Sequence, residues 1–287
     1  MLSSNSMFLP AQYQPAAYSL STLGIWGASD FLGGLGARRA NAFLFTSIVH
    51  LSGMILMASI ALLSHAPLPA GGSMQWALLA GALGGGSLAL FYRALASGKM
   101  GLTAPVAAVL SAAIPAVVTA FAEGVPGPLH LLGFMLAGIG VWLISRTEDR
   151  SGHPKGLGLA VIAGCGFAGF YLCIHMAGSG SALWIAVVSR FAALVVTSAF
   201  VLFGGNLRAV PARVLVIAVV AGCLDIGGSV LFVRAQQSGR LDQAVVLSSL
   251  YPAVTVLLAR IFLHEHFSRA RTVGMLAALL AVPMIAG

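Results

Sequence analysis

Charged residues are scarce in this chain of 287 residues. They make up 8% of it, with only seven Asp or Glu, whereas soluble domains carry about 25% charged residues. Hydrophobic residues supply 59% of the chain. Seven acidic side chains cannot keep a surface of this size soluble, and apolar stretches of membrane-spanning length recur throughout. We therefore expect an integral membrane protein with no additional soluble domain.

Cysteines are few, and several catalytic motifs are missing. Cys165, Cys173 and Cys223 lie in apolar segments without paired spacing, so they are expected to be small core residues. The chain has no P-loop, no His-Glu-x-x-His and no Ser/His/Asp arrangement, which argues against an ATP-driven pump and an intramembrane enzyme. The short cluster at 264–266, His-Glu-His, has no partner site, so no metal or other cofactor is expected.

The basic residues do not form the stripe that binds nucleic acid. The formal net charge is +8, but the Lys and Arg side chains lie at the ends of apolar runs, where membrane proteins use them as anchors. No Lys or Arg precedes the first apolar run, so that run is expected to remain as a helix and not to be cleaved as a signal peptide. Nucleic acid is therefore not an expected partner.

Ten apolar segments remain when the chain is divided where Pro, Gly and charges cluster. Each is long enough to cross about 30 Å of hydrocarbon as a helix. Their approximate cores are 18–35, 42–63, 76–96, 102–121, 129–144, 156–175, 182–202, 214–234, 244–262 and 272–285. The strongly polar linker at 146–155 separates five of them from the other five. The expected fold is an all-α integral membrane protein with ten transmembrane helices.

The two halves repeat each other. The segment at 81–99 matches the segment at 222–240 with nine identities in nineteen positions, and VLSAAIPAV from Val109 returns as VLSSLYPAV from Val246. The same alignment pairs His50 with Arg190. Because each copy holds an odd number of helices, the copies must lie in opposite orientations, which is typical of secondary transporters. The expected organisation is an N-terminal segment (1–17), a five-helix repeat (18–145), the linker (146–155) and a second five-helix repeat (156–287).

These features resemble the drug/metabolite transporter superfamily, specifically bacterial permeases with two EamA-type domains. The cues are WGASDF from Trp26, a [FL]-x-x-A-x-x-S-G turn after the third and eighth segments, a proline in the fourth and ninth, and Glu123 and Glu265 before the fifth and tenth. The resemblance implies a bacterial inner-membrane protein that moves small metabolites, often outward and often with protons. It also implies that both termini are cytoplasmic, whereas the Lys and Arg bias of the links places them outside. The orientation therefore stays open.

Four ionisable residues lie well inside apolar segments: Asp30, His50, Arg190 and Asp225. A charge at the bilayer centre costs at least about 2.5–3.5 kcal/mol, so each is expected to face a partner or a watery cavity. Asp30, Arg190 and Asp225 are candidate substrate-binding residues, and the two carboxylates are candidate proton carriers. The alternative is a structural ion pair that fastens two helices. His50 fits a hydrogen-bonded packing residue better.

Aromatic residues complete the expected site. Trp26 and Asp30 are four residues apart and share a helix face. Tyr171 and Tyr251 lie in helices that the resemblance places around the translocation path, and amphipathic rings suit a small organic solute. We expect Trp26, Asp30, Tyr171, Arg190, Asp225 and Tyr251 to converge on one polar cavity between the halves.

The sequence favours a secondary permease of small metabolites such as amino acids, working by alternating access with a proton gradient or the substrate's own gradient. The expected partners are the small-molecule substrate, membrane lipids and protons, and the expected assembly is a monomer or weak homo-oligomer. Two alternatives remain. A lipid-linked flippase, or a subunit of one, should open sideways to lipid, and a scaffold or sensor should have an interior filled with Leu and Phe.

Overall fold

The computed structural model describes residues 11–97, 100–145, 156–204, 209–263 and 268–286. Over these ranges the chain is all-helical and has no strand, as predicted. The helices are α1 (Gln14–Ala37), α2 (Ala42–Leu63), α3 (Gly71–Ser97), α4 (Met100–Glu123), α5 (Pro128–Ser145), α6 (Leu157–Met176), α7 (Ala182–Phe203), α8 (Ala212–Ser238), α9 (Leu241–Ser248), α10 (Tyr251–Leu263) and α11 (Arg269–Ala286), after a short 3-10 helix (Ala11–Tyr13). The linker at 146–155 and the cluster at 264–266 lie outside the described residues.

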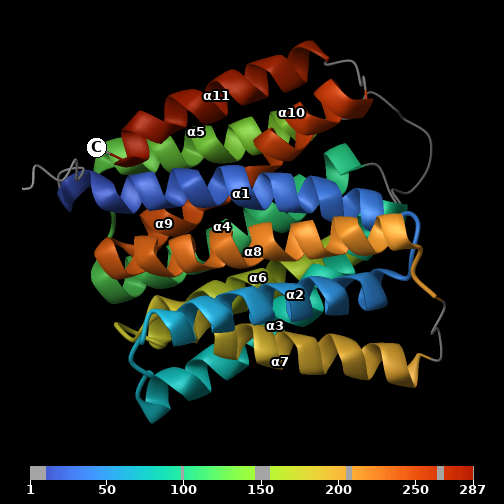
Figure 1. Cartoon of the computed structure of the whole chain (residues 1–287). Helices are drawn as coiled ribbons and strands as arrows, with labels where there is room; N and C mark the ends of the chain where they lie inside the picture. The colour runs from blue at the N-terminus through green and yellow to red at the C-terminus, as the bar shows by residue number, and fades with distance from the viewer. Residues whose placement is uncertain (1–10, 98–99, 146–155, 205–208, 264–267, 287) are drawn as a thin grey trace, which may run out of the picture.

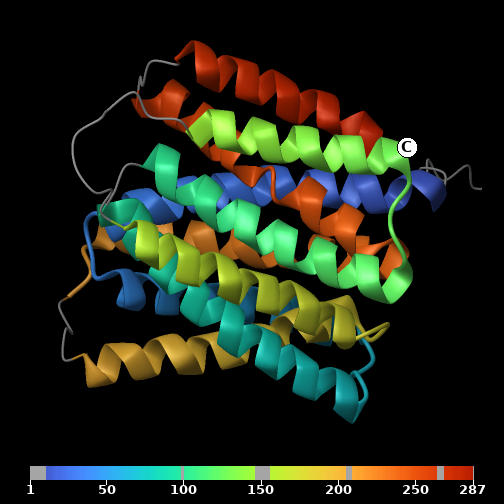
Figure 2. The same ribbon diagram turned by 180° about the vertical axis from the view of Figure 1, so that it is seen from behind.

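The helices form one bundle whose members run roughly along a common direction (Figure 1). The pair α5 and α11 packs together at one edge, and α2 and α7 pack together near the opposite edge. Between them, α1 packs against α8, and α3 packs against α6 and α7. Figure 2, from behind, shows that α1 begins and α11 ends at the same end of the bundle. Segments from the two halves of the chain therefore interleave throughout.

Six helical segments of the described residues are long and apolar enough to cross a membrane. They are Ala42–Leu63, Gly71–Ser97, Leu157–Met176, Ala182–Phe203, Ala212–Ser238 and Leu241–Phe262. The described apolar stretches of the remaining helices are shorter than these six or contain more polar residues. For example, α1 carries Asp30 together with several Gly and Ser residues, and α11 has only 18 residues, two of which are Arg. The chain is thus a multi-pass membrane protein, and the full count of ten spans stays a prediction.

The ninth expected segment, 244–262, is not one continuous helix. It divides into α9 and α10 at Ser249 and Leu250, where the Leu250 amide bonds to the Leu247 carbonyl at 3.3 Å. Pro252 explains the break, because it has no N–H to donate to Ser248 and its ring crowds the carbonyl four residues earlier. The expected span is therefore interrupted at this point, although Leu241–Phe262 still counts as one of the six membrane-capable segments.

Glycines allow the closest helix contacts in the bundle. A Cβ at Gly222 on α8 would collide with the Val49 carbonyl and the Ser52 hydroxyl of α2. A Cβ at Gly81 on α3 would likewise collide with the backbone of Ser189 on α7. Gly227 lies five residues after Gly222 on the same helix, and a Cβ there would meet nothing within 4 Å. The two α8 glycines therefore differ in whether the packing needs them.

Gly222→Ala should destabilise the protein by about 1–3 kcal/mol, because the new methyl group forces α2 and α8 apart. Gly227→Ala meets no neighbour and removes a flexible residue from a helix, which favours stability by up to about 1 kcal/mol. Thermal unfolding of both purified variants in detergent measures the difference. Equal midpoints for the two variants would contradict the close packing at Gly222.

Candidate functional site

One buried cavity collects all six of the residues expected to converge. It is lined by Trp26 and Asp30 of α1, Tyr171 of α6, Arg190 of α7, Asp225 of α8 and Tyr251 of α10. Its volume is about 50 Å³, which is room for a few water molecules at roughly 10–15 Å³ each. All six residues are buried, so the cavity lies inside the bundle. Their roles in binding or proton transfer stay predictions.

Five further lining residues were not among the expected ones: Gly84, Leu88, Phe167, Phe170 and Ser229. The repeat contained a signal for three of them. In the alignment of the halves, Gly84 is the counterpart of Asp225, and Leu88 is the counterpart of Ser229. Ser229 is also one helical turn from Asp225 and therefore shares its face. Helix α4 contributes none of the described lining residues, whereas α7 contributes Arg190.

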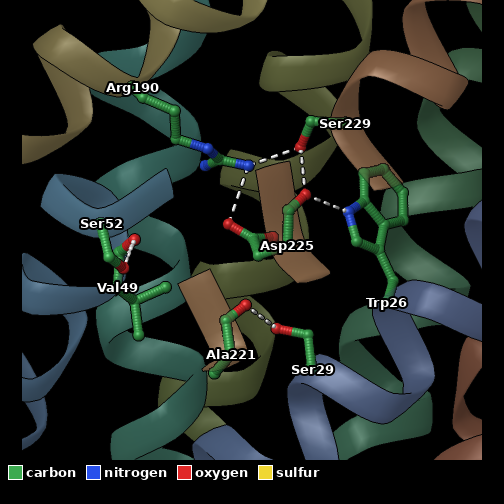
Figure 3. Close-up of polar contacts among 8 residues, drawn as sticks. All are labelled: Trp26, Ser29, Val49, Ser52, Arg190, Ala221, Asp225 and Ser229. Carbon is green, nitrogen blue, oxygen red and sulfur yellow. Dashed lines mark hydrogen bonds and ion pairs between the residues drawn. The ribbon is translucent and has the colours of Figure 1, made fainter. Parts of the chain in front are cut away.

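An ion pair joins α7 to α8 at the cavity (Figure 3). The guanidinium of Arg190 lies 2.8 Å from the Oδ2 atom of Asp225, and it also donates to the Ser229 hydroxyl. Ser229 in turn donates to the Asp225 backbone carbonyl at 2.9 Å, and the Trp26 indole N–H donates to the same carbonyl at 3.2 Å. Three helices, α1, α7 and α8, are thereby connected around one aspartate.

The second carboxylate has no such partner. Asp30 is 8% exposed and lines the same cavity, but no ion pair or hydrogen bond of its side chain is found within the described part of the chain. The neighbouring Ser29 turns away and donates to the Ala221 carbonyl at 2.9 Å. The cavity therefore holds one neutralised pair and one acid without a cation.

Aromatic rings form one wall of the cavity. The ring of Trp26 stacks near Tyr171, with centroids 6.1 Å apart, and near Phe232 at 5.5 Å. Tyr251 meets Phe91 edge to face at 6.3 Å. The Tyr251 hydroxyl is buried and has no hydrogen-bond partner among the described atoms.

A larger, more polar hollow lies at the end of the bundle where α1 ends. This vestibule has a volume of about 750 Å³, and its lining includes Arg38, Asn41, Phe43, Arg93, Ser97 and Phe200. The Arg38 and Arg93 side chains are exposed. Arg93 and its repeat counterpart Arg234 are both exposed near helix ends, which agrees with side chains that reach for lipid headgroups.

A dry aromatic layer separates the vestibule from the cavity. On α3, Tyr92 follows the cavity residue Leu88 by one turn and precedes the vestibule residue Ala96 by another. Tyr92 and Phe45 of α2 are both 0% exposed, and their rings meet at 6.0 Å. Gly33 and Gly36 of α1 make room for them, because a Cβ at either position would overlap the Tyr92 or the Phe45 ring. This layer lies between the cavity and the vestibule along α3.

His50, the repeat counterpart of Arg190, does not line the cavity. It is 0% exposed, as a packing residue should be. The backbone of Gly85 on α3 is a polar neighbour, but neither ring nitrogen has a partner with the geometry of a hydrogen bond among the described residues. The expected hydrogen bond is therefore not found. Removal from water favours a neutral ring that packs as a flat apolar group.

Replacing one partner of the ion pair should destabilise the protein more than replacing both partners. Arg190→Met leaves the Asp225 carboxylate buried without its cation, which costs about 3–5 kcal/mol. The double variant Arg190→Met with Asp225→Leu removes both charges and should regain most of that loss. Thermal unfolding of the double variant and of both single variants in detergent tests this. A double variant as unstable as the sum of the two single ones would show that the two side chains are not coupled.

Known proteins resemble the chain in sequence over its second half and in fold over nearly its whole length. The crystal structure of another protein superposes on this chain with a TM-score of 0.74 at 14% sequence identity. The superposition covers 94% of this chain and 95% of the other. At this identity the likeness concerns the fold alone. No curated protein sequence matches the chain. Residues 154–287 match the model of the EamA-like transporter family.

Proposed function

We propose that this chain is a secondary transporter of small organic solutes, such as amino acids or related metabolites, in the bacterial cytoplasmic membrane. The observation that carries the proposal is the cavity with Asp30, Arg190 and Asp225 deep in an apolar bundle. Each charge at such depth costs at least about 2.5–3.5 kcal/mol, and intramembrane charges usually mark a solute or ion pathway. The EamA-like domain supports transport as the general activity.

The transporter is built from two inverted repeats, 18–145 and 156–287, in this proposal. Reciprocal packing supports it: α1, the first helix of its half, packs against α8, the third of the other, and α6 packs against α3 in the same way. The closest contacts are reciprocal as well. Gly81 contacts Ser189, and its repeat counterpart Gly222 contacts Val49. Ser189 and Val49 are themselves repeat counterparts, because each directly precedes a member of the aligned pair Arg190 and His50. A two-fold axis in the membrane plane would produce such pairs.

Alternating access then requires the cavity to open toward one end at a time. The layer of Phe45 and Tyr92 is the closed gate on the vestibule side, and rocking of α1 against α3 would separate Gly33 from the Tyr92 ring. The pair of α7 and α8, fastened by Arg190 and Asp225, would move as one body. Opening would connect the cavity to the vestibule over about 10 Å, the rise from Asp30 to Ala37 along α1.

In this proposal the carboxylates of Asp30 and Asp225 are the groups that bind and release the coupled proton. An acid without a cation in a low-dielectric site tends to hold a proton, whereas an acid beside a guanidinium stays ionised. In this structure Asp30 is in the first situation and Asp225 in the second. Asp30 is therefore the first candidate for proton carrier, and Asp225 becomes one only when Arg190 leaves it, for example to bind an anionic group of the substrate.

The two alternatives have less support. A scaffold needs no charges that converge in its interior, but three line this cavity. A lipid flippase needs a charged path that opens sideways. The hollow between α4, α5 and α9, of about 260 Å³, is lined by residues such as Ala112, Phe134 and Val246, and it shares no lining residue with the charged cavity. Solute transport by a monomer or weak homo-oligomer remains the better account.

Purified protein in liposomes tests the proposal. Wild-type proteoliposomes incubated with a metabolite mixture should accumulate at least one small solute above the level of empty liposomes, as measured by mass spectrometry. Asp30→Asn and Asp225→Asn should then abolish or uncouple the transport of that solute, because they remove the carboxylates from the cavity. Both variants should still accumulate in the membrane.

Asp242→Asn is the matched control. Asp242 is a buried, ion-paired carboxylate on α9, 3.0 Å from Arg240, but it does not line the cavity. This variant should transport at close to the wild-type rate. Normal transport by both cavity variants would make the cavity carboxylates structural, and the absence of any transported solute with the wild type would end the transporter proposal.

Thiol labelling tests the gate. In a background with Cys165, Cys173 and Cys223 replaced by Ala, a water-soluble maleimide should label Ala96→Cys in the vestibule rapidly and Leu88→Cys in the cavity at least tenfold more slowly. Adding Tyr92→Ala removes the ring between the two positions and should raise the labelling rate of Leu88→Cys alone. Equal labelling rates at the two positions without Tyr92→Ala would show that the layer is not closed.

A further inference from the structure

We infer that the cavity binds a small organic cation, with Asp30 as the counter-charge and the rings of Trp26, Tyr171 and Tyr251 as the surrounding wall. The inference rests on the proposed transport function and names the substrate class of the same site.

The charge balance of the cavity is the first support. Its charged lining consists of Asp30, Arg190 and Asp225, so the ionised acids carry two negative charges against one positive. The positive charge is already used, because the Arg190 guanidinium lies 2.8 Å from Asp225. Asp30 has no cationic partner within the described part of the chain. Either a proton on Asp30 or a ligand with one positive charge beside it would make the cavity neutral, because a buried charge is stable only when it is paired.

The wall of the cavity is the second support. Trp26 and Tyr171 both line the cavity and lie stacked, with centroids 6.1 Å apart and planes 28° apart, and Phe170 lies edge-on beside Tyr171 at 5.5 Å. Electron-rich aromatic rings attract ammonium groups, and the attraction is stronger in a buried site than at a surface. The Tyr251 hydroxyl, buried and without a partner among the described atoms, can accept a hydrogen bond from an ammonium N–H.

Other ligand charges fit less well. An anion would have to displace Asp225 from Arg190 and would then lie beside two carboxylates. A metal ion needs several oxygen or nitrogen ligands, and no group of three or more His, Cys, Asp or Glu is found in the described ranges. The cavity instead offers one carboxylate amid apolar and aromatic carbon, which suits an ammonium on a small apolar body. Its volume of about 50 Å³ favours a compact molecule, and a probe of the size of benzylammonium requires the cavity to widen as it binds.

Binding to the purified full-length protein in detergent tests the inference with three probes of one shape. Benzylammonium is the cation, benzyl alcohol is the neutral isostere and benzoate is the anion, and the change in Trp fluorescence reports binding. Benzylammonium should bind at least tenfold more tightly than the other two probes. Preference for benzoate, equal binding of benzylammonium and benzyl alcohol, or no binding of benzylammonium overturns the inference.

Two substitutions assign the charge to Asp30. Asp30→Asn keeps the shape and should lose the preference for benzylammonium over benzyl alcohol, whereas Asp30→Glu keeps the charge and should retain a preference. If Asp30→Asn does not fold, the three probes can still be compared between Asp30→Glu and the wild type. That comparison tests whether the preference for the cation depends on Asp30. Asp242→Asn should bind benzylammonium as the wild type does.

The inference and the proposed function fail in different ways. Proteoliposomes that transport only neutral or anionic solutes would leave the transporter function standing and would overturn the cation site. Selective benzylammonium binding without transport of any solute would support the site and contradict the transporter.

Discussion

The structure depends on how an apolar bundle accommodates one buried ion pair and one further buried acid, Asp30. Arg190 and Asp225 neutralise each other at 2.8 Å, and the backbone carbonyl of the same aspartate receives hydrogen bonds from Ser229 and Trp26. Water cannot replace these contacts in a low-dielectric interior, so losing one partner leaves an expensive charge. The pair therefore fixes α7 and α8 relative to α1. It also leaves Asp30 as the lining charge that a solute or proton can use.

Each charged residue of the cavity occurs in one half without an identical counterpart in the other, although the halves share packing residues. In the alignment of the halves, Asp225 corresponds to Gly84, Arg190 to His50 and Asp30 to Gly169. The glycines that let helices approach closely are shared, as Gly81 and Gly222 show, but the charges are not. Packing alone requires the shared residues. The unshared ones are consistent with a single solute site where the two halves meet.

Much of this was predictable from sequence, and the exceptions have physical reasons. Apolar runs and polar breaks correctly predict the bounds of α2 at 42–63. The six residues expected to converge line one cavity, and their roles stay predictions. Pro252 marks the break between α9 and α10, because it removes a backbone hydrogen bond although the apolar content continues through it. Ser229 and Phe170 were missed because short polar and apolar lining residues look like ordinary packing until tertiary contacts are known. The dry layer of Phe45 and Tyr92 joins α2 to α3 and has no local sequence signal.

We propose that Asp30 carries a proton when no solute is bound and pairs with a cation when one is. The titratable groups around it are Arg190, Asp225, Tyr92, Tyr171 and Tyr251. Counting protons released on benzylammonium binding, in weakly buffered detergent solution with a pH indicator, tests this claim most directly. We expect close to one proton per bound cation for the wild type and no release by Asp30→Asn. Cation binding by the wild type without proton release at any pH would contradict the claim.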